Sequence, residues 1–182
     1  MKKFEEYLNR RRLEITKPYI KGSVLDIGCG PATTYTSLKI ENYSGIERNL
    51  DSVKKLKEKF PLAKFYVKDI EKERLNFNKK FDTIVLLAVI EHIGNTKILY
   101  KEIKKSLKMK GKLVMTTPTP FGNFIHTILS FIGLTSKHAA KEHVNICSRM
   151  KFIGIAKKYG FKIIKYKQFE LWCNSLIVLE KI

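Results

Sequence analysis

The segment Ser23–Gly30 constrains the fold of this chain more than any other part of its 182 residues. Residues Ser23–Ile27 form a short apolar run, which predicts a buried strand. The run leads directly into the turn Gly28-Cys29-Gly30-Pro31, and residues Ala32–Leu38 predict a helix. In this order, a strand, a glycine-rich turn and a helix let the backbone approach a ligand closely, and the helix N-terminus adds favourable amide dipoles. The segment therefore predicts an α/β fold with a ligand site at the turn.

The following part of the chain alternates between apolar runs and amphipathic segments. The apolar runs predict strands over Tyr43–Ile46, Lys64–Val67, Phe81–Leu87 and Lys112–Thr116. The amphipathic segments between them, and the opening segment that ends near Lys17-Pro18, predict helices. This alternation is typical of βαβ units and a parallel sheet.

Capping residues predict where two of these helices begin and end. Asp51 and Ser52 predict the N-cap of a helix that is stopped by Pro61. Asn95 or Thr96 predicts the start of the next helix, and Gly111 predicts its end.

The last part of the chain departs from the alternating pattern. Ser148 predicts the cap of a helix that ends at Gly160, and two strand-like runs, Phe161–Tyr166 and Leu171–Leu179, follow without a helix between them. Two adjacent strands with so short a connection must be antiparallel. We therefore expect a three-layer α/β sandwich, a Rossmann-like fold, whose seven-stranded, mostly parallel sheet has an antiparallel last strand. The whole chain, residues 1–182, is expected to be a single domain.

Composition limits the class of protein. Cys29, Cys147 and Cys173 share no pairing pattern, so we expect no disulfide framework, no metal site and a reducing compartment. No apolar segment follows the N-terminal charges, and the uncharged apolar runs fall short of the roughly 20 residues that span a bilayer. These observations favour a soluble, cytoplasmic protein without a transmembrane segment.

The formal net charge of +19 raises the question of an anionic partner. The positive residues are mostly Lys and lie along the whole chain, whereas phosphate and base recognition favour the bidentate fork of Arg. A solvated, Lys-rich surface is therefore favoured, and nucleic-acid binding stays open as an alternative. The cluster Arg10-Arg11-Arg12 is expected on an exposed helix face, with contact to an anionic substrate as the alternative.

Charge also separates the adenosine cofactors that such a turn could bind. Glu47 follows Asp26 by twenty-one positions at the end of the next strand, where a carboxylate accepts hydrogen bonds from ribose hydroxyls. The dinucleotide fingerprint has a third glycine, but Thr33 stands in that place. Asp26 before the turn would repel a pyrophosphate and would suit an ammonium group. S-adenosylmethionine is therefore favoured over NAD.

At this point the sequence resembles the class I S-adenosylmethionine-dependent methyltransferases, over most of its length. Val24–Gly30 resembles their first motif and Ser44–Glu47 the second, and Val67–Ile70, Phe81–Leu87 with Val89–Ile93, and Leu107–Leu113 resemble the later ones. The resemblance implies that Asp26, Gly28 and Gly30 hold the methionine end, Glu47 the ribose, and Asp69 and Ile70 the adenine. It also implies that the backbone of Leu86 and Leu87 closes the site beneath the methyl group. The cofactor-binding set implied by the resemblance is Asp26, Gly28, Cys29, Gly30, Glu47, Arg48, Asp69, Ile70, Leu86 and Leu87.

The acceptor side is expected in an insertion or lid around residues 117–145. Its apolar face predicts a helix that covers the sheet edge, with a lid or a membrane-facing surface as the alternative, so peripheral membrane contact stays open. His143 is the candidate general base, His138 is a second candidate, and His126 is expected to be a satisfied buried group. Glu91-His92 is expected to start a helix, with a direct catalytic role as the alternative.

The predicted activity is methyl transfer to a small-molecule, sugar-linked or lipid-linked acceptor. Methyltransferases of this fold that modify the adenine amino group of DNA or RNA resemble one another in an Asn/Asp-Pro-Pro-aromatic motif at the end of the fourth strand. This chain has Leu87–Ile90 at that place, which disfavours adenine-amino methylation. An RNA or protein methyltransferase is the first alternative. The less favoured alternatives are a non-catalytic S-adenosylmethionine-binding module and a nicotinamide-dependent oxidoreductase.

Overall fold

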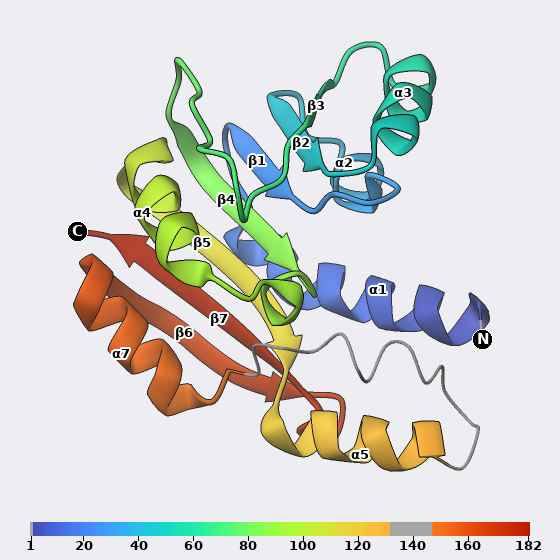
Figure 1. Ribbon diagram of the computed structural model, residues 1–182, viewed down its shortest axis with the longest axis vertical. Helices are drawn as coiled ribbons and strands as arrows, with labels where there is room; N and C mark the ends of the chain where they lie inside the picture. Colours follow the sequence, from blue (N-terminus) through green and yellow to red (C-terminus); the bar gives the residue numbers. More distant parts are fainter. Residues whose placement is uncertain (1, 132–146) are drawn as a thin grey trace.

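A computed structural model of the chain describes residues 2–131 and 147–182. These residues form an α/β structure around one seven-stranded sheet (Figure 1). The strands are β1 (Val24–Ile27), β2 (Tyr43–Glu47), β3 (Lys64–Val67), β4 (Phe81–Leu87), β5 (Leu107–Pro118), β6 (Phe161–Phe169) and β7 (Asn174–Lys181). The helices are α1 (Lys2–Thr16), α2 (Thr33–Leu38), α3 (Leu50–Lys59), α4 (Thr96–Ser106), α5 (Pro120–Phe131) and α7 (Arg149–Tyr159), with short 3₁₀ turns η1 (Lys17–Tyr19) and η2 (Ile90–His92).

The strand order is β3-β2-β1-β4-β5-β7-β6. The first five strands of this order pair in parallel, because each crossover between them passes through a helix or a long loop. A short turn joins β6 to β7, so these two strands are antiparallel. β7 is also antiparallel to β5. The predicted fold, a mostly parallel seven-stranded sheet with an antiparallel last strand, is confirmed.

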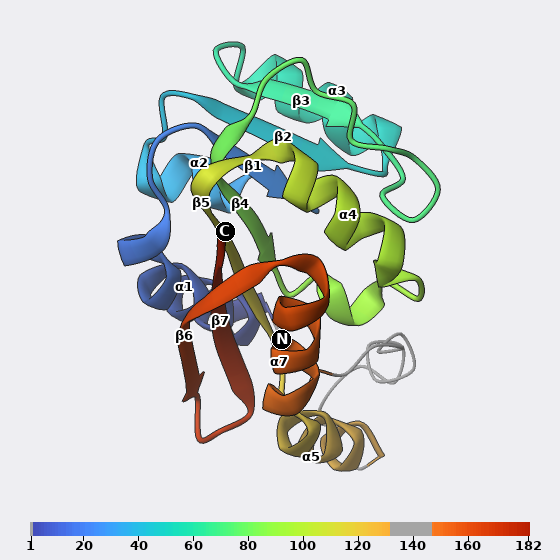
Figure 2. The ribbon, with the colours of Figure 1, turned by 90° about the vertical axis from the view of Figure 1, so that its left-hand side faces the viewer.

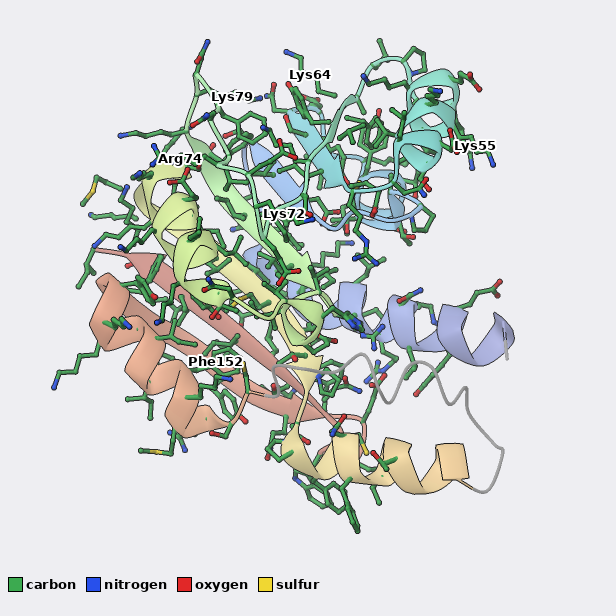
Figure 3. The ribbon with its side chains drawn as sticks, viewed as in Figure 1. Lys55, Lys64, Lys72, Arg74, Lys79 and Phe152 are labelled. Atoms are coloured by element: carbon green, nitrogen blue, oxygen red, sulfur yellow. The ribbon has the colours of Figure 1, made fainter. Side chains whose placement is uncertain are left out.

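Helices cover both faces of the sheet. α4 and α7 lie on one face and α1 on the other (Figure 2). Phe152 is fully buried and points from α7 toward the sheet (Figure 3). On the opposite face, Val53 and Leu56 of α3 pack with Val24 and Phe65. The central strands are apolar along their length because both of their faces are covered.

Two of the predicted helix boundaries are wrong. The N-cap of α3 is Asn49, whose extended backbone lets its side chain accept a hydrogen bond from the N–H of Ser52 at 2.8 Å, so Ser52 already lies inside the helix. α4 ends at Ser106 and not at Gly111, because β5 begins at Leu107. The Nζ of Lys181 caps the end of α4 by donating to the carbonyls of Lys104 and Leu107.

The basic side chains come from many elements. Those labelled in Figure 3 lie on α3 (Lys55), on β3 (Lys64), in the connection after β3 (Lys72 and Arg74) and before β4 (Lys79). Among the described residues, no helix is both long and apolar enough to cross a membrane.

We expect Asn49→Ala to lower the free energy of unfolding by about 1 kcal/mol, because it removes the side chain that caps α3. Ser52→Ala is the matched control and should change that free energy by less than about 0.5 kcal/mol. Urea unfolding of the two variants measures both values. A larger loss in Ser52→Ala than in Asn49→Ala would show that the cap has been assigned to the wrong residue.

Candidate functional site

The glycine-rich turn after β1 is held against the end of β2. The backbone N–H groups of Gly28 and Cys29 both donate to the carbonyl of Ile46, at 2.9 and 3.0 Å. Gly28 has a φ of +71°, and a Cβ added there would lie 2.6 Å from Cγ2 of Val89. Glycine is therefore required at this position both by the left-handed backbone and by the close approach of Val89.

A pocket of about 560 Å³ opens beside this turn, at the carboxyl ends of the parallel strands. This is the edge at which open α/β sheets bind their ligands. The volume lies in the range of small-molecule and cofactor sites. The pocket is lined by Gly28, Ile46, Glu47, Arg48, Lys68, Asp69, Ile70, Glu71, Ala88, Val89, His92 and Ile93.

The carboxylate of Glu47 is anchored at the pocket wall by the backbone. One oxygen accepts hydrogen bonds from the N–H groups of Arg48 and Asn49, and the other accepts from Gly30 at 3.3 Å. A carboxylate offers about four acceptor positions, so the second oxygen keeps capacity for a ligand hydroxyl. The side chain is thus oriented before any ligand binds.

Asp69 lies across the pocket from the turn, directly after β3. Its carboxylate accepts a hydrogen bond from the N–H of Glu71 and pairs with Lys72 at 3.3 Å. The backbone bond and Lys72 hold the pKa of Asp69 below its ordinary value, so this half-buried carboxylate is ionised at neutral pH. Glu71 in turn accepts from the N–H groups of Gly94 and Asn95, which ties this loop to the segment before α4.

The far wall of the pocket follows the end of β4. Ala88 has a φ of +56° and donates its N–H to the carbonyl of Thr116. This left-handed residue turns the chain away from the strand and into η2, so that Val89 and His92 reach the pocket.

Asp26 lies outside the pocket lining. Its carboxylate is buried and accepts a hydrogen bond from the hydroxyl of Tyr43 at 2.9 Å. Burial raises the pKa of Asp26 to about 6, against the opposing effect of the hydrogen bonds from Tyr43 and Thr34. Burial likewise raises the pKa of Cys29 to about 12, which makes this residue an inert thiol in the turn.

The structure brings half of the predicted cofactor residues together. Gly28, Glu47, Arg48, Asp69 and Ile70 line one pocket. The others lie behind or beside it: Asp26, Cys29, Gly30, Leu86 and Leu87, of which Leu86 is fully buried in the core.

Several lining residues were not predicted as site residues. Lys68 and Glu71 carry no regular spacing signal, because they lie in the loop after β3. Val89 and His92 stand in the motif after β4, where the sequence predicts a helix start at Glu91-His92, with a catalytic role as the alternative.

The predicted general base His143 lies outside the described residues, as does His138. The side chain of His126 is also outside them. The role of His143 therefore stays a prediction. Over residues 2–131 and 147–182, no group of three or more His, Cys, Asp or Glu side chains could hold a metal ion.

Residues 2–166 match the family described as a methyltransferase domain. The chain belongs to this methyltransferase family. It is 34% identical over 95 residues to a putative methyltransferase, 235L, of Invertebrate iridescent virus 6, across 50% of this chain and 35% of that protein. It is 26% identical over 99 residues to a ubiquinone biosynthesis O-methyltransferase of Rickettsia bellii, across 52% of this chain and 41% of that protein. The matched segments therefore cover less than half the length of these curated relatives.

Solved structures share the fold. A putative methyltransferase from Haloferax volcanii, in complex with the Trm112 methyltransferase activator, has a TM-score of 0.75 at 13% identity, over 95% of this chain and 88% of that chain. An S-adenosylmethionine-dependent methyltransferase from Mesorhizobium loti has a TM-score of 0.74 at 13% identity, over 96% and 98% of the two chains.

S-adenosylmethionine is the cofactor of this methyltransferase fold. The residues of the pocket fit it, because Glu47 and Asp69 offer fixed carboxylate acceptors at neighbouring strand ends and Gly28 leaves room for a close backbone approach. The structure thus supplies the donor and acceptor types that an adenosine with a cationic methionine end requires.

Asp26→Asn is expected to remove a pH dependence of stability. Because the pKa of Asp26 is about 6 in the folded chain against an ordinary 3.8, the folded state keeps a proton that the unfolded state releases. The free energy of unfolding should therefore fall by about 3 kcal/mol as the pH rises from about 4 to about 6.

Urea unfolding of both proteins at intervals between about pH 4 and pH 7 measures this difference. The unmodified chain should show the fall, and Asp26→Asn should lack most of it. An equal fall in both proteins would show that another group titrates.

Proposed function

We propose that the pocket binds S-adenosylmethionine and that the chain transfers its methyl group to a small acceptor. The observation that carries the assignment is the convergence of Glu47 and Asp69, from the ends of neighbouring strands, on the one pocket that also contains Gly28. Glu47 accepts hydrogen bonds from the ribose hydroxyls. Asp69 accepts from the adenine amino group, and Ile70 packs against the adenine ring.

The methionine end lies over the glycine-rich turn. Gly28 presents backbone there without a side chain, and Val89 packs over it from the opposite wall. Asp26 is proposed to act from beneath the turn: its carboxyl binds the Tyr43 hydroxyl, and the cationic ammonium and sulfonium groups of the cofactor would favour its ionised form. The backbone at Leu86 and Leu87 leads the chain to Ala88, which lines the pocket.

Bound S-adenosylmethionine supplies an activated methyl group on a sulfonium. The chain's own residues hold the reacting groups in line and exclude water, which can supply most of the rate of such a displacement. A base is needed only when the acceptor carries a proton that must leave. His92 lines the pocket, and His143 is the sequence-based candidate for this role.

The acceptor is proposed to be a small molecule, including sugar-linked or lipid-linked compounds. The Rickettsia relatives are named as ubiquinone biosynthesis O-methyltransferases, which supports this class. The chain enters the proposed insertion, residues 117–145, through Thr117 and Pro118 at the carboxyl end of β5, and β4 ends beside them. We place the acceptor side there, within a single domain.

We expect Glu47→Ala to weaken S-adenosylhomocysteine binding by about 10- to 100-fold, since it removes charged hydrogen-bond acceptors from the ribose. The thermal shift that S-adenosylmethionine or S-adenosylhomocysteine produces should be mostly lost. Glu41→Ala, exposed before the other end of β2, is the matched control and should keep the full shift. An undiminished thermal shift in Glu47→Ala would contradict the assignment of Glu47 to the ribose. Thermal protection of the chain by NAD but not by S-adenosylmethionine would show that the pocket binds a nicotinamide cofactor.

A single-turnover screen with labelled S-adenosylmethionine tests the reaction. Label should move to hydroxylated or amphiphilic small molecules and not to RNA or protein. Label found in RNA, together with RNA binding that falls steeply with salt, would instead favour the RNA methyltransferase. Cofactor binding without transfer to any acceptor would favour a sensor module.

A further inference from the structure

The turn between β6 and β7 packs against the start of α5. The hydroxyl of Thr119 donates to the carbonyl of Trp172 at 2.6 Å and accepts from the N–H of Gly122 at 2.9 Å. A Cβ at Gly122 would overlap the carbonyl of Cys173, so the two segments are in direct contact. Figures 1 and 2 both show α5 and this turn at the same end of the molecule.

Four large apolar side chains at this junction point into solvent. Leu171 and Trp172 in the turn are 82% and 64% exposed, and Phe121 and Phe124 of α5 are 51% and 62% exposed. We call these four residues the apolar rim. Single exposed apolar residues are ordinary on a protein surface, but a cluster of large ones from two segments indicates an interaction site.

The turn that carries Leu171 and Trp172 has a strained backbone. Glu170, Leu171 and Trp172 have φ values of +53°, +52° and +64°, in three successive residues. Each non-glycine residue in this region costs of order 1 kcal/mol or more, and such strain persists where surrounding structure or function requires it.

The charges beside the rim are mainly positive. α5 has no charged residue along its sequence PFGNFIHTILSF. Arg11 and Arg12 of α1 lie near enough to interact electrostatically with Glu170, which places these two arginines near the turn. Arg10 and Arg11 both pair with Glu14, and Arg12 is half-buried. Exposed Lys167 adds a further positive charge, so the positive residues outnumber the carboxylates of Glu14 and Glu170.

We propose that the apolar rim inserts into the surface of an anionic phospholipid bilayer. Large apolar side chains beside basic ones, with Trp at the boundary, are the combination that binds the interface of such a membrane. The overall charge of +19 adds long-range attraction to the same surface.

The rim and the pocket lie at the same end of the sheet. β5 and β6 run in the same direction as β4, and their carboxyl ends lead into the two segments of the rim. If the proposed function holds, a lipid-linked acceptor could reach the site from the bilayer. Membrane binding itself needs neither cofactor nor acceptor, so it is tested separately from methyl transfer.

Trp172 is the one tryptophan of the chain, so its fluorescence reports directly on the rim. The full chain is titrated with vesicles of phosphatidylcholine containing phosphatidylglycerol, and with phosphatidylcholine alone. The expected result is a shift of the emission to shorter wavelength with the anionic vesicles, quenching by brominated lipid, and weaker binding at high salt.

The double variant Phe121→Ser/Phe124→Ser keeps Trp172 as the fluorophore. It should lower the partition coefficient between water and the anionic vesicles by about tenfold or more. Leu62→Ser, at a site 89% exposed before β3, is the matched control and should bind as the unmodified chain does. Circular dichroism of each variant confirms folding.

Three outcomes would overturn the proposal. One is no change in Trp172 emission with anionic vesicles. Another is equal binding by the rim variant and the control, which would indicate adsorption through lysines alone. The third is self-association without lipid that Trp172→Ser abolishes, which would make a second copy of the chain the occupant.

Discussion

Two hydrogen bonds from the N–H groups of Gly28 and Cys29 to the carbonyl of Ile46 join the glycine-rich turn to the end of β2. Glu47 follows Ile46 directly, so these bonds hold the turn beside the carboxylate of Glu47, which accepts the N–H of Gly30. Beneath them, Gly45 allows Cys29 and Phe65 to approach, since a Cβ there would lie within 3 Å of both. The pocket therefore depends on the parallel pairing of β1, β2 and β3 and on the packing of a few small residues.

The pocket differs in charge from the rest of the molecule. The chain carries a net charge of +19, yet three carboxylates, Glu47, Asp69 and Glu71, line the pocket against two basic residues. Each carboxylate accepts at least one backbone N–H group, which orients it, and for Asp69 this bond also lowers the pKa. A cofactor without phosphate and with a cationic methionine end matches such a site, whereas a dinucleotide does not.

The fold and the main pocket residues could be predicted from the sequence because strand periodicity and parallel pairing determine where strands end. Glu47 and Asp69 follow apolar runs, and the carboxyl ends of parallel strands meet at one edge. The place of Asp26 just before the turn does not show, however, in which direction its side chain points. The burial of its carboxylate against Tyr43 could therefore not be predicted. The end of α4 depends on Lys181, which is distant in the sequence.

Loop contributions were the least predictable part of the site. Glu71 reaches the pocket because it bonds to the backbone before α4, and His92 because left-handed Ala88 redirects the chain. Neither arrangement follows from periodicity or capping. The two segments of the apolar rim are separated by about fifty positions in the sequence, and they meet through the hydrogen bonds of Thr119 to Trp172 and Cys173 and the packing of Gly122 against Cys173.

The most direct test of this account is a crystal structure of the chain with S-adenosylhomocysteine. We expect the ribose hydroxyls to lie within hydrogen-bonding distance of Glu47, the adenine amino group to lie beside Asp69, and the homocysteine backbone to lie over Gly28. An adenosine bound anywhere else, or a ribose that does not contact Glu47, would contradict the assignment of this pocket.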